Sequence, residues 1–279
     1  MKAFIQVLLC LLVAVVPARA FPPAPYYTLY GMVRDQVGQT VTAEGAEIIL
    51  LKGGVEIGRT PITNGQLDQN YELHIRIDAA RSGTTIYTDK AIAAQGTYSL
   101  VVAMNGALFY PIEVNDTLKA GTGGERTRLD LNLGADANKD GLPDVWEEWQ
   151  LYQAGIYPDA NGNWNLDLLG GMNGDFDHDG QSNLQEYLSG TFAGDATETF
   201  SLTLKEKQEA SVRFEFYAIT GKVYTLESTL DMKTWTQVPF SVATPGAGRP
   251  AYQATDVGIL SAFTAPRSAT NEFFRLTVR

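Results

Sequence analysis

Short apolar or alternating runs, separated by glycine, asparagine and aspartate turn signals, make up most of the first half of the chain. Alternation over about four to eight residues is typical of a half-buried strand, and few windows show a helical period. We therefore predict a β-sandwich-like domain over residues 21–134. The predicted strands lie in "YTLYGMVRD" (27–35), "AEIILLKGG" (46–54), "YELHIRID" (71–78), "GTYSLVVAM" (96–104) and "LFYPIEV" (108–114).

A β pattern returns over residues 196–279, where we predict a second, smaller β-sandwich-like domain. We expect Trp235, Phe273 and Phe274 in its core, because large aromatic side chains in such strands usually pack inside. The stretch "GKVYTLESTLDMKTWTQV", with "FFRL" near the end, resembles a small C-terminal β module of secreted modular bacterial proteins. The predicted strands are "SVRFEFYAI" (211–219), "KVYTLEST" (222–229), "AYQAT" (251–255) and "EFFRLTV" (272–278).

Residues 135–195 are the only part with clear helix signals. The stretch "DVWEEWQLYQAG" predicts a short amphipathic helix that carries Val145, Trp146, Trp149, Tyr152 and Gln153 and stops at Gly155. In "SNLQEYLSG", Ser182 and Gln185 form a capping-box pattern, and Gly190 marks the end. The predicted fold is thus mostly β, with two β-sandwich-like domains joined by a loop-helix segment.

Two twelve-residue stretches in this segment, "DANKDGLPDVWE" (136–147) and "DFDHDGQSNLQE" (175–186), space their oxygen-bearing residues alike. Calcium takes about six to eight oxygen ligands, and such a loop supplies them from positions 1, 3, 5, 7, 9 and 12, with a glycine at position 6. Both stretches match at every position, so we predict two bound Ca²⁺ ions. The predicted ligands are Asp136, Asn138, Asp140, the Leu142 carbonyl, Asp144 and Glu147 in the first loop, and Asp175, Asp177, Asp179, the Gln181 carbonyl, Asn183 and Glu186 in the second.

The loops depart from ordinary EF-hands in two ways. A strand-like stretch (127–135) precedes the first loop and a glycine-rich one (168–174) the second, so we expect no entering helix. Position 8, where paired EF-hands join through an apolar residue, holds Pro143 and Ser182. The alternative is two solvated turns rich in Asp and Asn, which two complete matches disfavour.

Residues 135–192 resemble the bacterial thrombospondin type 3 repeats in "DANKDGLPDVWE" and "DHDGQSNLQEYLSGT". This resemblance implies structural calcium in a spacer of a secreted modular protein. The stretch "PDANGNWNLD" (158–167) begins like a third loop but has Trp164 in place of the glycine, and we interpret it as a linker. The opening stretch "GMVRDQVGQTVTAEGAEIILLKGG", with "GTYSL" after it, resembles prealbumin-like or carboxypeptidase-regulatory-like sandwiches.

The first twenty residues combine a lysine, an apolar run and the ending Ala18, Arg19, Ala20, which is typical of a secretory signal peptide. We expect a protein that is secreted or held at the cell surface, with no membrane span. Cleavage would remove Cys10, the one cysteine, so disulfides and thiolate metal sites are not expected. Residues 135–190 hold eleven acidic residues and one basic residue, which disfavours nucleic acid as a partner.

Catalysis is not expected, because His74 and His178 fit no known catalytic motif and the paired carboxylates are assigned to calcium. The favoured interpretation is a structural or adhesive protein whose partner is cell-surface polysaccharide or protein. One alternative is a carbohydrate-binding accessory protein that uses Tyr26, Tyr27 or Trp164 as a ring platform. Another is a dockerin-like scaffold-docking protein, although dockerin loops usually end in Asp rather than Glu.

Overall fold

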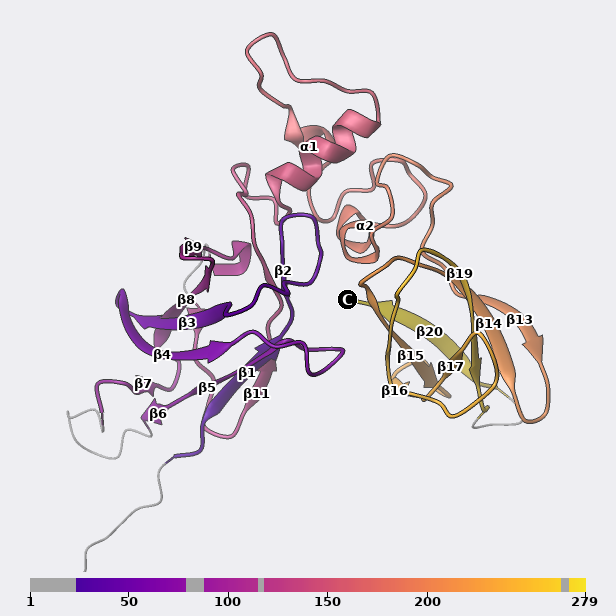
Figure 1. Cartoon of the computed structure of the whole chain (residues 1–279), viewed down its shortest axis with the longest axis horizontal. Coiled ribbons are helices and arrows are strands. Elements are labelled where there is room, and N and C mark those ends of the chain that lie inside the picture. Colours follow the sequence, from indigo (N-terminus) through magenta and orange to yellow (C-terminus); the bar gives the residue numbers. More distant parts are fainter. Residues whose placement is uncertain (1–23, 79–87, 115–117, 267–270) are drawn as a thin grey trace, which may run out of the picture.

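The computed structural model describes residues 24–78, 88–114, 118–266 and 271–279, and this part of the chain is mostly β (Figure 1). Strands of the first half and of the last third form separate groups, and both described α-helices come from the stretch between them. The predicted signal peptide (1–20), with Cys10, lies outside the described residues. Neither described helix is long and apolar enough to cross a membrane.

The first group of strands surrounds one hydrophobic core. The order of one sheet is β11-β1-β5, and that of another is β10-β8-β3-β4, with β9 paired to β8. Tyr71, Leu73 and Ile75 point into the core while Glu72 and His74 do not, as the alternation predicts. The strands are β1 (Tyr27–Gly31), β2 (Val33–Arg34), β3 (Glu47–Lys52), β4 (Val55–Pro61), β5 (Tyr71–Ile75), β6 (Ile77–Asp78), β7 (Ile92–Ala93), β8 (Thr97–Met104), β9 (Ala107–Phe109), β10 (Leu118–Lys119), β11 (Arg126–Arg128) and β12 (Leu131–Asn132).

The first and last strands of this group lie side by side and run in the same direction. β1 pairs with β11 in parallel, and β2 pairs with β12 in parallel. Leu131 and Leu133 are buried in the same core as Leu29 and Val33. The chain therefore leaves this core beside the stretch with which it entered.

The predicted strand over 108–114 is only partly correct. β9 ends at Phe109, and Ile112–Val114 form a short 3-10 helix, η1. Pro111 has no backbone N–H to donate to a continuing ladder, which explains why the strand stops here. Leu108, Phe109 and Tyr110 are exposed.

The second group of strands also surrounds one core. Its sheets have the orders β13-β14-β19-β17 and β16-β15-β18, with β20 paired to β15. Val212, Phe214 and Phe216 of the first sheet pack with Tyr224 and Leu226 of the second. The strands are β13 (Thr203–Lys207), β14 (Val212–Ala218), β15 (Val223–Thr229), β16 (Thr236–Gln237), β17 (Ser241–Val242), β18 (Tyr252–Gln253), β19 (Gly258–Thr264) and β20 (Phe273–Val278).

Of the three aromatic residues expected in this second core, only Phe274 packs there. Its ring centroid lies 4.9 Å from that of Phe214. Phe273, on the opposite face of β20, is 43% exposed, because adjacent strand residues point to opposite sides. Trp235 is half-buried under Arg275, whose guanidinium carbon lies 4.3 Å from the ring centroid.

The two predicted helices are present as α1 (Asp144–Gln153) and α2 (Asn183–Ser189), with a 3-10 turn, η2 (Leu166–Leu168), between them. Both bonds of the capping box between Ser182 and Gln185 form, and Gly190 ends α2 in the left-handed conformation, with φ of 81°. No α-helix enters either acidic loop, as the sequence predicts: β12 precedes the first loop, and the short 3-10 turn η2 ends at Leu168, before the second.

The buried face of α1 differs from the predicted one. Val145, Trp149 and Tyr152 are 38%, 49% and 54% exposed. The helix instead buries Glu147 and Gln150, together with the apolar Trp146 and Leu151. A third, smaller core forms around these apolar residues, and its buried members are Leu142, Trp146, Leu151, Leu169, Tyr187 and Ala193.

We predict that Asn70→Ala lowers the free energy of unfolding by about 1–3 kcal/mol, because it leaves the buried Val33 N–H without a partner. The Asn70 side chain accepts from the Val33 N–H at 2.8 Å and donates to the Val33 carbonyl at 3.2 Å. Urea denaturation followed by circular dichroism measures the loss. The control is Asn64→Ala in the same connection: Asn64 is exposed, so its change should stay within about 0.5 kcal/mol. Equal effects of both substitutions would contradict this account.

Candidate metal centre

The first acidic loop is held in a tight turn by its own carboxylates. Asp136 accepts from the backbone N–H of Asp140 at 3.1 Å with one oxygen and from that of Gly141 at 3.2 Å with the other. Asp140 in turn accepts from the N–H of Leu142 at 3.0 Å. The Asn138 amide donates to Asp140 Oδ2 at 2.9 Å, so positions 1, 3 and 5 gather on one side of the turn.

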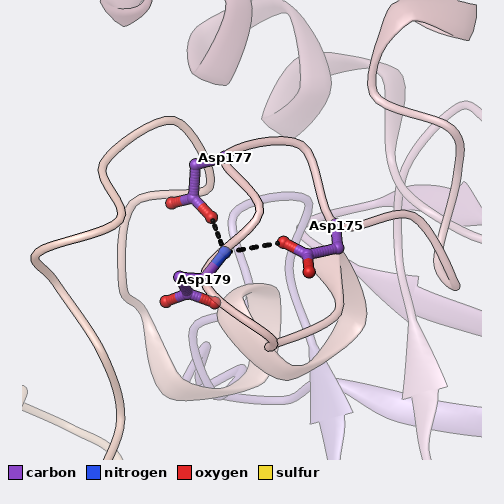
Figure 2. Close-up of side chains that lie close together, drawn as sticks. All are labelled: Asp175, Asp177 and Asp179. Atoms are coloured by element: carbon purple, nitrogen blue, oxygen red, sulfur yellow. Dashed lines mark hydrogen bonds between the residues drawn. The ribbon is translucent and has the colours of Figure 1, made fainter.

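The second loop repeats this geometry. Asp175 accepts from the N–H groups of Asp179 and Gly180 at 3.2 and 3.1 Å, and Asp179 accepts from the N–H of Gln181 at 2.6 Å. Asp175 and Asp177 both point toward the backbone nitrogen of Asp179 (Figure 2). One carboxylate oxygen from each of the three aspartates lies within 4.8 Å of the others, close enough to share one metal ion.

The backbones of the two loops also match. Position 4 is left-handed in both, with φ of 59° at Lys139 and 63° at His178. Position 6 has φ of 94° at both Gly141 and Gly180, a conformation that favours glycine. Two stretches that differ in most of their letters therefore adopt one conformation, which follows from the positions that they share.

The position-12 glutamates are buried without partners. Glu147 and Glu186 lie in the first turns of α1 and α2, and both are 0% exposed. None of their four carboxylate oxygens accepts a hydrogen bond from the described residues. Asn138 Oδ1 and Asp177 Oδ2, at position 3 of each loop, are buried and unpartnered as well. Buried acceptors normally have partners, so these six oxygens mark two places where a cation would complete the structure.

Burial and neighbouring carboxylates change the acidity of both glutamates. Burial, with the nearby charges of Asp140 and Asp144, raises the pKa of Glu147 to about 9. Burial and the three aspartates of the second loop raise the pKa of Glu186 to about 8. Burial also raises the pKa of Asp177. Without a cation, the glutamates hold protons at neutral pH that a metal ion would have to displace.

Position 9 braces the loop in both cases. Asp144 Oδ1 accepts from the Ala137 N–H at 2.9 Å, and Asn183 Oδ1 accepts from the Phe176 N–H at 3.3 Å. The Asn183 amide also donates to the Leu169 carbonyl at 2.6 Å. These residues fix position 2, a role that the sequence analysis missed when it assigned them only as ligands.

At position 7 the predicted ligand is the backbone carbonyl, of Leu142 in the first loop and of Gln181 in the second. The Leu142 side chain is fully buried in the third core, which anchors its backbone within the loop. Gln181 is tied through its side chain, which donates to Asp179 Oδ2 at 3.1 Å and accepts from the Phe200 N–H at 3.0 Å. The structure thus holds all twelve predicted residues in two compact loops.

A glycine-rich connector joins the two loops. The Met172 N–H donates to the Asp140 carbonyl at 3.3 Å, and the Met172 carbonyl accepts from the Leu184 N–H at 3.1 Å. A Cβ on Gly171 would lie 2.8 Å from Asp140 Cβ, and one on Gly141 would lie 2.5 Å from Met172 Cε. The connector, rather than position 8, therefore brings the loops together, and its glycines permit the close approach.

The stretch "PDANGNWNLD" forms a separate turn. Asp159 accepts from the N–H groups of Asn161 and Asn163 at 2.9 and 2.8 Å, so its carboxylate closes its own turn. Trp164 packs against the third core. His178 is exposed at position 4, and His74 is exposed on β5, where its Nδ1 lies 3.1 Å from Thr28 Oγ1.

Comparison of the chain with protein families, with curated proteins and with solved structures found no match.

We predict that, in a chelator, the folded loop segment loses stability as the pH rises from about 5 to about 9. The raised pKa values of Glu147 and Glu186 mean that the folded state binds more protons than the unfolded state across this window. The stabilisation is complete below the ordinary carboxyl pKa and is lost as the folded groups ionise. Thermal melting at several pH values measures it, and a melting temperature that rises with pH would contradict the assignment.

Proposed function

We propose that the chain is a secreted calcium-binding modular protein that binds two Ca²⁺ ions, one in each acidic loop. The observation that carries this proposal is the set of six buried, unpartnered oxygens, which fall at positions 3 and 12 in both loops. These are two of the positions from which twelve-residue calcium loops supply ligands. A pair of solvated turns would not bury carboxylates at matching positions without donors.

The donor set favours calcium over other metals. Zinc sites in proteins are usually built from Cys and His ligands. The described loop residues instead offer carboxylate, amide and carbonyl oxygens, and the one histidine in them, His178, is exposed. Magnesium requires near-ideal octahedral geometry and usually retains several waters. Two loops with several protein oxygens and a long, adaptable glutamate are better suited to calcium.

The proposed role of the ions is structural. The third core has six buried apolar residues, against nineteen in the first core, so it buries far less surface to offset the entropy of ordering. An ion in each loop would join positions 1 to 5 to the first turn of the following helix through Glu147 or Glu186. The free energy of calcium binding would then contribute directly to folding of this segment.

In this proposal, residues 1–20 are a signal peptide, and two β-sandwich-like domains, 21–134 and 196–279, are joined by the calcium-binding segment 135–195. The protein would act outside the cell or at its surface as a structural or adhesive component, with polysaccharide or protein as its partner and without catalysis. The internal contacts of residues 135–195 support a stiff connection rather than a loose linker.

The carbohydrate-binding alternative depends on a platform of exposed rings. Tyr27 is 3% exposed and belongs to the first core, and Trp164 packs against the third core. Tyr26 is 48% exposed, and its ring centroid lies 5.5 Å from that of His74. Only one ring of these three is exposed, so these residues do not form the platform that this alternative needs.

We predict that calorimetric titration with calcium detects two sites, with dissociation constants of about 0.1–1 mM, as in other extracellular modules. Glu147→Gln and Glu186→Gln should each weaken one site about tenfold or more, because an amide offers one neutral oxygen in place of two charged ones. His178→Ala is the control and should change neither site, since the exposed imidazole is not a ligand. The absence of binding at several millimolar calcium, above the weakest expected constant of about 1 mM, would refute the proposal.

We also predict that chelation exposes residues 135–195 to proteases while the two β regions persist. The β cores contain no calcium ligands and bury their own apolar strands. Limited proteolysis with and without chelator, followed by mass spectrometry, locates the first cuts. The same first cuts in both conditions would show that calcium, even if bound, does not order the segment.

A further inference from the structure

A single buried lysine connects all three parts of the chain. Lys222 lies in the turn before β15 and is 2% exposed. Its Nζ donates to the Gly38 carbonyl at 2.8 Å and to the Tyr187 carbonyl at 3.2 Å. Gly38 belongs to the turn after β2, and Tyr187 to helix α2. One amine thus joins the first strand group, the calcium-binding segment and the second strand group.

Both the backbone and the side chain of Tyr187 are fixed by contacts. Its hydroxyl donates to the Asp35 carbonyl at 3.0 Å and lies 3.4 Å from Asn132 Oδ1. Its ring packs edge-on against Trp146 with a centroid separation of 5.6 Å. Together with the bond from Lys222 to its carbonyl, these contacts fix both the backbone and the side chain of a residue that is 1% exposed.

Two glycines allow this close packing. A Cβ on Gly38, where φ is 79°, would lie 2.9 Å from the Tyr187 carbonyl oxygen and 3.3 Å from Lys222 Nζ. A Cβ on Gly190, at the end of α2, would lie 3.4 Å from Lys222 Cε. The turn that carries Gly38, the end of α2 and the Lys222 turn therefore fit together with no room for an added methyl group at Gly38.

This junction lies one residue from the second candidate metal site. Tyr187 directly follows Glu186, the position-12 glutamate, in the same turn of α2. The equivalent residue after Glu147 is Glu148, which is half-buried and has no side-chain partner among the described residues. The two loops have closely matching internal conformations. Among the described residues, only in the second loop does the residue beside the position-12 glutamate, Tyr187, contact both strand groups.

We infer that Tyr187 and Lys222 are positioning residues for the second calcium site, and that calcium binding there is coupled to the docking of both strand groups on α2. The inference rests on the proposed function, because it assumes that the second loop binds calcium. The junction holds the turn of α2 that presents Glu186 to the ion. Coupling between binding equilibria is reciprocal, so an ion that fixes Glu186 also favours the docked junction.

The test compares the affinities of the two loops separately. Calcium is titrated calorimetrically into full-length protein carrying Glu147→Gln, which leaves the second loop as the stronger site, and into protein carrying Glu186→Gln, which leaves the first. Into each background we introduce Lys222→Met, which keeps most of the unbranched side chain but removes the amine donor, or Tyr187→Phe, which keeps the ring without its hydroxyl. Tyr187→Phe removes no packing, so it serves if Lys222→Met does not fold.

Both substitutions should weaken calcium binding at the second site about fivefold or more, which is the lower end of typical coupling between sites. The affinity of the first site should change by less than about twofold. A merely destabilising substitution would weaken both loops, since they share the third core and the connector. The inference is overturned if the second site keeps its affinity or if both sites weaken equally. If the unsubstituted protein binds no calcium, the proposed function itself fails, which is a distinguishable result.

A pair of glycine substitutions provides a matched control from the opposite side of the junction. Gly38→Ala places a methyl group against Tyr187 and Lys222 and should weaken the second site. Gly45→Ala introduces similar backbone strain, with φ of 73°, but its Cβ would have no neighbour within 4 Å. The inference requires that Gly38→Ala weakens calcium binding by the second loop and that Gly45→Ala does not. Equal effects of the two would attribute the result to general strain and overturn it.

Discussion

The buried carboxylates of Glu147 and Glu186 set the main constraint on the centre of this structure. A carboxylate taken out of water must be protonated, hydrogen-bonded or paired with a positive charge. The described residues supply neither donor nor counter-charge to these four oxygens. Each helix start is therefore unfavourable for the charged glutamate unless a positive charge or a proton compensates it, and the proposed calcium ion would supply that charge. The conformation of each loop, the start of each helix and the small third core all depend on how that charge is compensated.

Much of this site could be predicted from the sequence, because its determinants are local. The spacing of acids and glycines in a twelve-residue window fixes which side chains converge, and the Ser182–Gln185 capping box and Gly190 fix both ends of α2. The strand-rich character of both ends follows from alternation alone. The hydrogen bonds that Asp144 and Asn183 accept from the backbone of position 2 were missed. An Asp or Asn that binds a metal cannot be told from one that accepts from a neighbouring N–H by its residue type alone.

The remaining features depend on contacts between distant residues. The hydrophobic pattern of α1 predicted a helix but not its buried face, because Glu147 must face the loop and Gln150 accepts from the Ala193 N–H at 2.9 Å. Nothing near Lys222 in the sequence indicates that its amine would reach Gly38, 184 residues away. The glycines at 170, 171 and 174 indicated only that no helix enters the second loop. In the structure, the second and third of them make room for Asp140 and Asn183, respectively.

The parallel pairing of β1 with β11 and of β2 with β12 has a mechanical consequence for a protein of this organisation. The chain enters the first core at the start of β1 and leaves it after β12, so a pull along the chain acts on opposite ends of neighbouring strands. Such a force slides the strands past one another and strains their hydrogen bonds together, whereas strands pulled from the same end separate one bond at a time. The first strand group is thus arranged to resist tension transmitted along the chain.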